Sequence, residues 1–282
     1  MNGSTVERQL STVEFENVVK HVFRGSAESY GDELTAFWIN DHIKKARDGC
    51  HEFDALLEEK LQEPPSLDVL DLCCGWGEFV VNFRKRGIKC YGIDISDTIY
   101  HGLVLARENS IPSSFINGDV YSLPFKSDFF DVVYSFSALE HIERPQELLK
   151  QIYRVIKPGG SLFLTFPNPL YPIDGHTFLW FVPYLPHSLA EKYVKLRKKR
   201  RATDHWDVWY HKRRHVNTWA KRAGFTEIGV YPPNRLWGRR SRQMHQFTIK
   251  HFILKIADFF NINISKYWNI TSDMIFLIMA KS

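Results

Sequence analysis

The feature that most constrains the fold is an alternation of short apolar runs and amphipathic stretches between Leu67 and Phe166. The apolar runs read "LDVLDLCC", "IKCYGIDIS", "SSFINGD", "FFDVVYSFS" and "SLFLTFP", and segments with helical spacing separate most of them. One such segment, "RPQELLKQIYRVIKPGG", has Pro145 near its first turn and a Pro-Gly-Gly stop, which predicts a helix ending at Gly160. Apolar strands buried on both faces and joined by helices are typical of a parallel sheet. We therefore expect an α/β fold with a doubly wound sheet.

Two regions depart from this alternation. Residues 1–65 mix charged and apolar residues at helical spacing and end at two prolines, which predicts an N-terminal helical extension or cap. Residues 167–215 are first aromatic and proline-rich and then strongly basic. This stretch is too long for an ordinary connection and predicts a substrate-side insertion. We therefore expect the extension over 1–65 and one domain over 66–282 that contains the insertion.

The composition excludes several classes of protein. The 282 residues carry a formal net charge of +5, which is too modest for a dedicated nucleic-acid binder, so we do not expect nucleic acid as a partner. The beginning of the chain has no apolar signal segment, and no run approaches the roughly 18 apolar residues of a spanning helix. The four cysteines form no C-x-x-C pair. We expect reduced thiols and a cytoplasmic protein.

The loop after the first apolar run, in "VLDLCCGWGEF", favours a ligand site. Gly75 and Gly77 let the backbone approach a ligand at the carboxyl end of a strand. A dinucleotide-binding fingerprint needs a third glycine where Val80 stands, and Asp71 would repel a pyrophosphate. A nicotinamide dehydrogenase is therefore disfavoured. The carboxylate of Asp71 suits a cationic ligand without phosphate, such as S-adenosylmethionine.

Two more carboxylates follow the next two predicted strands. Asp94 ends the second strand, where it can accept both hydroxyls of a ribose, and Asp119 follows the third, where it can accept from an adenine amino group. Each aspartate alone is also explained as a cap or turn residue. Three at successive strand ends, with Gly-x-Gly after the first, favour a binding site.

These motifs resemble those of class I S-adenosylmethionine-dependent methyltransferases, in particular the type 11 or ubiquinone-menaquinone methyltransferase-like group. "VLDLCCGWGEF" resembles their first motif, "YGIDIS" the second, "NGDVYSLPF" the adenine motif and "FDVVYSFSALEHIERP" the segment after the fourth strand. The resemblance implies a Rossmann-like, seven-stranded, mostly parallel sheet with an antiparallel last strand, and S-adenosyl-L-methionine as cofactor. It implies these cofactor-binding residues: Asp71, Cys73, Gly75, Gly77, Asp94, Ile95, Asp119, Val120 and Ser135.

Cys73 is the one departure, because it stands where the family pattern has its first glycine. If this residue needs a positive φ, a cysteine costs on the order of 1 kcal/mol; if it lies in strand geometry, it costs nothing. We expect cofactor binding to be retained in either case.

Two histidines are the candidate catalytic residues. His141, in "ALEHIERP", follows the fourth strand, where the resemblance places it beside the transferred methyl group, and His176 lies in the "IDGH" turn of the insertion. Either could serve as the base that an alcohol nucleophile needs, or His141 could only anchor the loop or the cofactor. Glu140, His141 and His176 could instead hold a divalent ion, as in some related O-methyltransferases. Those carry another acid where Ser137 stands, so we expect no metal.

The insertion is the predicted determinant of the acceptor. Its aromatic part, "FLWFVPYLP", lies beside the basic run "KLRKKRR", which favours a small-molecule acceptor that is lipid-linked or a glycoconjugate, methylated at oxygen. Residues 178–201 are then a candidate contact with a membrane surface. Two rivals stay open: an RNA or protein methyltransferase that docks through the basic insertion, and a non-catalytic partner subunit. The sequence assigns no oligomeric state.

Overall fold

The computed structural model describes the following residues: 13–24, 32–48, 67–95, 99–112, 114–177, 179–198, 207–230 and 274–281. The chain forms two compact units. The first comprises Met1–Cys50 and Pro64–Val120, and the second comprises His51–Glu63 and Tyr121–Ser282.

The first unit contains three parallel strands and four described helices. Its elements are α1 (Val13–Arg24), α3 (Asp32–Asp48), β1 (Asp68–Leu72), α5 (Glu78–Lys85), β2 (Lys89–Asp94), α6 (Ile99–Glu108) and β3 (Phe115–Asn117). The strand order is β3-β2-β1. In register, Asp71 faces Gly92, and Asp94 faces Asn117. The carboxyl ends of the strands that carry two of the predicted site residues are therefore at one edge of this part of the sheet.

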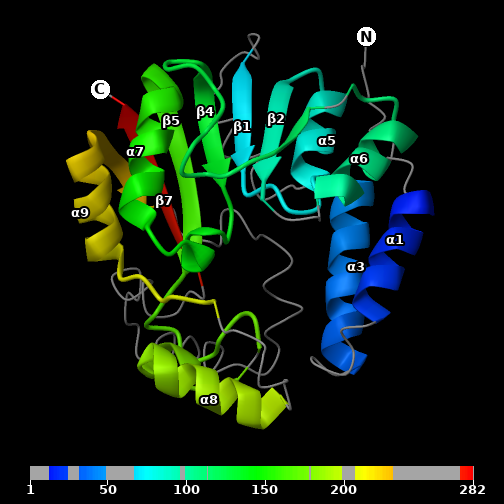
Figure 1. The fold of residues 1–282 in the computed structure, drawn as a ribbon, viewed down its shortest axis with the longest axis vertical. Helices are drawn as coiled ribbons and strands as arrows, with labels where there is room; N and C mark the ends of the chain where they lie inside the picture. Colours follow the sequence, from blue (N-terminus) through cyan, green and yellow to red (C-terminus); the bar gives the residue numbers. More distant parts are fainter. Residues whose placement is uncertain are drawn as a thin grey trace, which may run out of the picture. The chain divides into compact units, whose positions relative to one another are not determined.

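The two N-terminal helices pack beside each other, and α1 also packs against α6, whereas α3 packs against α5 (Figure 1). Phe15 and Val19 of α1 are fully buried in a cluster that also contains Trp76 from the loop after β1. Glu108 at the end of α6 accepts hydrogen bonds from the backbone N–H groups of Glu14 and Phe15, at 2.7 and 3.1 Å. These two N–H groups lie in the first turn of α1, where no carbonyl group of the helix can accept from them. Glu108 therefore acts as a cap.

The second unit contains four strands. Its elements are β4 (Phe130–Ser135), η1 (Leu139–His141), α7 (Pro145–Val155), β5 (Ile156–Pro167), η2 (Val182–Tyr184), α8 (His187–Lys198), α9 (Arg213–Ala223), β6 (Phe225–Val230) and β7 (Met274–Lys281). The strand order is β4-β5-β7-β6. β4 pairs with β5 in parallel, whereas β7 is antiparallel to both β5 and β6. Helices α7 and α9 lie next to each other (Figure 1).

One predicted boundary is wrong. The helix that the sequence predicts as far as Gly160 ends at Val155, and β5 begins at Ile156. Ile156 pairs with Phe130, and the register shifts before Val132 pairs with Ser161, so the Pro-Gly-Gly segment is an irregular start of a strand. Lys157 in this segment forms an ion pair with Asp131 at 2.8 Å. Pairing with β4 thus decides the conformation that the turn-forming residues alone do not.

The fold class is confirmed as mixed α/β, mostly parallel, with an antiparallel last strand. The final helix and two strands of the described part of the chain are α9, β6 and β7. The predicted domain boundaries stay a prediction, and the end of the N-terminal extension lies outside the described residues. Among the helices of the described part of the chain, none has both the length and the apolar character needed to cross a bilayer.

Candidate active site

The loop after β1 is a sequence of left-handed backbone conformations. The strand ends at Leu72, and Cys73, Gly75 and Gly77 have φ values of 59°, 49° and 75°. Cys73 therefore adopts the positive φ that the sequence left open, which a non-glycine residue adopts at a cost of about 1–2 kcal/mol. The N–H of Gly77 donates to the carbonyl of Cys74 at 2.9 Å. Gly77 is the N-cap of α5, which starts at Glu78.

The glycines of this loop meet different surroundings. A Cβ on Gly77 would lie 2.5 Å from the ring of Phe115 and 3.0 Å from the Cα of Gly102, so only glycine fits there. A Cβ on Gly75 would have no atom within 4 Å among the described residues. Gly77 is therefore needed for packing, whereas Gly75 leaves open space at the loop, where a ligand can approach the backbone.

Asp94, at the end of β2, holds this loop. Its Oδ2 accepts a hydrogen bond from the backbone N–H of Gly75 at 2.8 Å, so the second predicted strand-end carboxylate is joined directly to the first loop. The neighbouring Ile95 is 71% exposed. After β3, Asp119 is exposed and Val120 is buried. The first unit therefore contains every predicted cofactor-binding residue except Ser135.

Asp71 is buried at the carboxyl end of β1. Burial raises its pKa well above the ordinary value, and the negative charges of Glu78 and Asp94 raise it further. A bound cation would offset both effects, because it stabilises the charged carboxylate. The charge argument from the sequence thus agrees with the surroundings of Asp71.

The residues present fit S-adenosylmethionine, the cofactor that the resemblance implies. Its positive charges suit the buried Asp71, and the open space at Gly75 admits a ligand close to the backbone. In the second unit, Ser135 at the end of β4 is fully buried, and its hydroxyl has no hydrogen-bond partner among the described residues. Because an unpaired buried hydroxyl is costly, a ligand contact would explain it.

A second group of polar side chains lies in the second unit, around η1. Glu140 is fully buried, and its Oε1 accepts a hydrogen bond from the hydroxyl of Ser137 at 2.5 Å. The backbone carbonyl of Glu140 accepts from the N–H of Trp209 at 2.8 Å. Ser137 itself has a φ of 50°, and its N–H donates to the hydroxyl of Thr165 on β5. The segment after β4 is therefore fixed from both sides.

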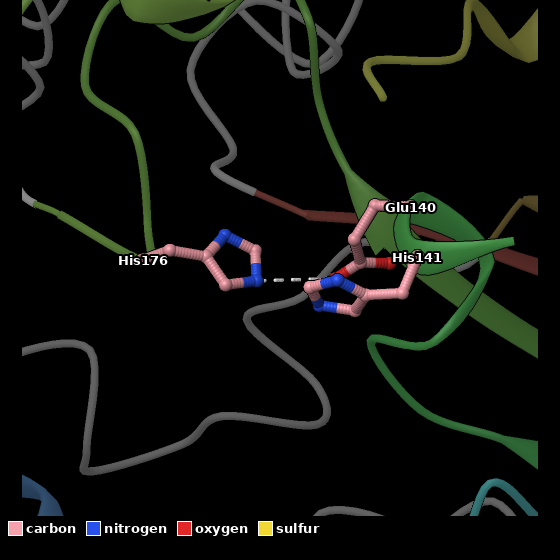
Figure 2. A group of neighbouring side chains, drawn as sticks. All are labelled: Glu140, His141 and His176. Atoms are coloured by element: carbon pink, nitrogen blue, oxygen red, sulfur yellow. Dashed lines mark ion pairs between the residues drawn. The ribbon is translucent and has the colours of Figure 1, made fainter. Parts of the chain in front are cut away.

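The structure brings His176 of the insertion to Glu140. Its Nε2 lies 3.6 Å from Glu140 Oε1 (Figure 2). Its Nδ1 lies 3.3 Å from Asp174 Oδ1. Burial lowers the pKa of His176, but the carboxylates of Asp174, Glu140 and Asp207 outweigh it and raise the pKa above its ordinary value. The histidine thus binds a proton more strongly than a free imidazole.

Asp174 is the fixed point of this arrangement. It is fully buried, and its Oδ2 accepts from both the N–H and the hydroxyl of Thr177, at 2.7 and 2.5 Å. The hydroxyl of Tyr210 donates to its other oxygen. Burial raises the pKa of Asp174, but the hydrogen bonds from His176, Thr177 and Tyr210 outweigh it and lower the pKa to about 2.

His141 completes the group. Its Nδ1 lies 3.2 Å from Asp207 Oδ2, and that contact lowers the pKa of Asp207. The rings of His141 and His176 are 5.1 Å apart and perpendicular. Both predicted catalytic histidines therefore lie next to one buried carboxylate, and each has a second carboxylate at its Nδ1. Such a group can accept a proton from a hydroxyl or hold a cation.

The sequence missed three residues of this group: Asp174, Asp207 and Tyr210. Asp174 had a local signal, since an aspartate three residues before a threonine commonly accepts from that residue's N–H. Asp207 and Tyr210 had none, because they lie more than thirty residues from His176 and only the fold of the insertion brings them close.

The insertion also presents apolar side chains to solvent. We call these the insertion's exposed apolar residues: Leu170, Trp180, Phe181, Tyr184, Leu189 and Leu196. The rings of Trp180, Phe181 and Tyr184 follow one another at 5.9 and 6.2 Å. Other apolar residues of the insertion, among them Val182, Ala190 and Val194, are buried in a small core. Residue 178 and residues 199–201, the end of the basic run, lie outside the described residues.

Comparison with known proteins finds a domain model and relatives that match part of the chain. A family model described as a methyltransferase domain matches residues 70–164. An uncharacterized methyltransferase from Synechocystis is 33% identical over 118 residues, which cover 41% of this chain and 54% of that protein. A demethylmenaquinone methyltransferase from Lactococcus lactis is 30% identical over 148 residues, which cover 50% of this chain and 58% of that protein. The chain thus spans about half the length of these curated relatives.

Solved structures share the fold over a longer stretch. An S-adenosylmethionine-dependent methyltransferase from Mesorhizobium loti has a TM-score of 0.53 at 18% identity, covering 83% of this chain and 99% of that chain. A phosphoethanolamine N-methyltransferase from Haemonchus contortus, solved with S-adenosylhomocysteine, has a TM-score of 0.55 at 18% identity, covering 96% of this chain and 60% of that chain. The matched domain model and the relatives named methyltransferase make part of this chain similar in sequence to methyltransferases, and the solved structures show that it shares their fold.

Proposed function

We propose that this chain transfers a methyl group from S-adenosylmethionine to an oxygen atom of a small-molecule acceptor, and that the acceptor is lipid-linked or a glycoconjugate. The observation that carries the proposal is the group formed by Glu140, His141 and His176, with Asp174 and Asp207 behind the two histidines. An alcohol oxygen needs a base to remove its proton, and this group offers proton acceptors with fixed orientation.

When bound, S-adenosylmethionine supplies a methyl group made electrophilic by the sulfonium. The chain's own residues then have three roles. Asp94 and the glycines hold the loop after β1. Asp71 offers negative charge to a cationic ligand. His176 is the proposed base: its pKa is raised by Asp174 and Glu140, so it takes the hydroxyl proton readily, and Asp174 stabilises the charge that results. His141 is the alternative base.

The exposed apolar residues of the insertion support a lipid-linked acceptor. Leu189, Lys192 and Leu196 lie three and four residues apart on α8, so they share one face of the helix, and all three are exposed. A mixed apolar and basic face is typical of contact with lipid headgroups. The name of the Lactococcus relative, demethylmenaquinone methyltransferase, gives a small molecule as that protein's acceptor, which also favours a small acceptor here.

A labelling assay with extracts, first on the wild type and then on two variants, tests the proposal. Lipid and aqueous extracts from a strain that lacks the protein are incubated with purified protein and S-adenosylmethionine that carries a labelled methyl group. We expect one labelled product in the organic phase, heavier than its precursor by one labelled methyl group in place of a hydrogen, with the label on oxygen by fragmentation. The His176→Gln variant should lower its rate of formation, whereas His215→Gln, an exposed change on α9, should not.

Other outcomes decide for the rivals. Label in RNA or protein, lost at high salt, would support docking through the basic residues. Label on nitrogen or carbon would contradict the oxygen target. Cofactor binding without any labelled product from these extracts would favour the non-catalytic partner subunit.

A further inference from the structure

In contrast to the expectation of no metal from the sequence, we propose that Glu140, His141 and His176 form a binding site for a divalent cation of the first transition series, such as Mn²⁺ or Zn²⁺. Each side chain offers one ligand atom, and the three atoms lie within 4.8 Å of one another (Figure 2). Ligands at about 2.0–2.2 Å from a cation are roughly 3–4 Å apart, so a small movement of side chains closes the site.

The surroundings of both histidines match those of metal ligands. A histidine that binds a metal through one ring nitrogen almost always has a carboxylate, carbonyl or water at the other. Here the Nδ1 of His176 faces Asp174 at 3.3 Å, and the Nδ1 of His141 faces Asp207 at 3.2 Å. The two carboxylates come from separate parts of the insertion. Each contacts the Nδ1 of a histidine and so leaves the Nε2 of that histidine for the cation.

The buried carboxylate of Glu140 is the second, independent observation. The side chain is fully buried, and its Oε2 has no hydrogen-bond partner among the described residues. An unpaired buried carboxylate oxygen is expensive, and a cation would satisfy it. Ser137 occupies the other oxygen, and Trp209 holds the backbone of Glu140, so the carboxylate is fixed in place.

The donor set indicates the class of cation. Two imidazoles and one carboxylate suit Mn²⁺, Co²⁺, Fe²⁺ or Zn²⁺ better than Mg²⁺ or Ca²⁺, which take oxygen ligands. Three protein ligands also leave coordination positions for the acceptor. The exposed side of His141 gives access from solvent.

The use of this site in catalysis rests on the proposed transfer to oxygen, whereas binding of the cation does not. With the cation bound, His176 is a ligand and no longer the base, and a hydroxyl bound to the cation loses its proton to solvent water at lower pH than a free alcohol does. The oxygen then forms a bond to the methyl carbon while the S–C bond of the sulfonium breaks. The electron pair of the S–C bond goes to sulfur. The site thereby supplies, in one arrangement, both the activation and the position of the acceptor oxygen.

The test is direct titration of the full chain with Mn²⁺ after removal of metals with EDTA, followed by paramagnetic resonance, with Co²⁺ absorption as a second probe. We expect one saturable site per chain. The Glu140→Gln and His176→Gln variants should each lower the affinity at least about tenfold, and Asp174→Asn about 10- to 100-fold. The matched controls are Glu143→Gln and His215→Gln, which are exposed and outside the group, and these should bind like the wild type.

Circular dichroism identifies any variant that fails to fold, and the isosteric Glu140→Gln change is the decisive one. The inference is overturned if the wild-type chain shows no saturable binding, or if folded Glu140→Gln binds Mn²⁺ as tightly as the wild type. Cation binding without any methyl transfer would leave this inference standing and remove the proposed function. Methyl transfer at full rate in EDTA, with no cation bound, would support the proposed function and contradict the use of the cation in catalysis, whereas the titration alone decides whether the site binds a cation.

Discussion

Gly77 is the single residue of the cofactor loop with the strongest packing requirement. Its φ of 75° lies in the left-handed region, and a Cβ would meet the ring of Phe115 and the backbone of Gly102. Gly87, at the end of α5, also has a positive φ, 84°, but a Cβ there would have no atom within 4 Å among the described residues. An added Cβ therefore strains the backbone at both glycines, but it crowds neighbouring atoms only at Gly77.

We predict that Gly77→Ala lowers the free energy of unfolding more than Gly87→Ala does. Both changes cost about 1–2 kcal/mol for the left-handed backbone. Gly77→Ala should lose about 1–3 kcal/mol more because it overpacks the contact with Phe115. Urea unfolding measures both. Equal losses for the two variants would mean that the loop does not pack on β3 as described.

The cysteines give a second prediction at this scale. Cys74 and Cys90 are buried, and burial, with Asp71 as a further cause, raises the pKa of both thiols. Cys73 is partly exposed in the cofactor loop. We predict that iodoacetamide at pH 8 modifies Cys73 before Cys74 or Cys90, because only a thiolate reacts. S-adenosylmethionine should slow the modification of Cys73, as measured by peptide mass spectrometry. Modification of Cys74 or Cys90 at the rate of Cys73 in the folded chain would contradict the placement; all three should react alike in urea.

The sequence predicts the residues of the cofactor loop better than those of the second group. Asp71, Gly75, Gly77 and Asp94 follow strands at fixed places, so their local spacing carries the information. Asp207 reaches His141 only through the path of the insertion, which no local pattern predicts. The positive φ of Cys73 was also open, because a strand end and a turn are equally compatible with its neighbours.

At the scale of elements, the N-terminal helices are joined to the cofactor loop through Trp76. Its ring stacks on His101 at 4.3 Å and on Phe23 at 5.6 Å, and His42 of α3 is 4.8 Å away. His42 also contacts Glu78, the first residue of α5, at 2.5 Å. Residues that the sequence predicts as an extension thus support the loop that carries the glycines.

We predict that Phe15→Ala lowers the free energy of unfolding by about 3–5 kcal/mol and weakens S-adenosylmethionine binding, because Phe15 is fully buried against Trp76. Val13→Ala, two residues earlier on the same helix and 73% exposed, should change neither quantity. Urea unfolding and calorimetry measure the two effects. Unchanged cofactor affinity in folded Phe15→Ala would show that α1 does not support the loop.

The insertion is the second element with a testable role. We predict that the double change Trp180→Ser and Leu196→Ser lowers binding to anionic phospholipid vesicles by about tenfold or more, because each side chain contributes apolar surface. Val13→Ser, which removes an exposed apolar side chain outside the insertion, is the control. Vesicle sedimentation measures the bound fraction. Equal binding by the double variant and the control would contradict a membrane contact through the insertion.

Sequence patterns predicted the elements well where burial on both faces imposes apolar strands, as in β1, β4 and β7. They failed at the junction of α7 and β5, because proline and glycine at 158–160 are typical of a turn. There the pairing of Ile156 with Phe130, together with the ion pair of Lys157 and Asp131, extends the strand backwards. A pairing across the sheet has no signature in the local sequence, so the boundary could not be predicted.

At the scale of the whole molecule, the account depends on one property: the chain binds S-adenosylmethionine at the strand-end carboxylates of its first unit. The match of residues 70–164 to a methyltransferase domain supports this property, and the described loop, the buried Asp71 and the Asp94 contact fit it. The acceptor, the cation and the membrane contact are further proposals that each have a separate test.

The most direct measurement is calorimetric titration of the full chain with S-adenosylmethionine. We expect saturable binding at one site per chain, weakened in Asp94→Ala by about 1.5–3 kcal/mol, or roughly ten- to a hundredfold, because the loop contact and the contacts with the ligand are lost. Asp68→Asn, at the opposite end of β1, should bind like the wild type. No binding at millimolar cofactor, or equal affinity in folded Asp94→Ala, would contradict the account.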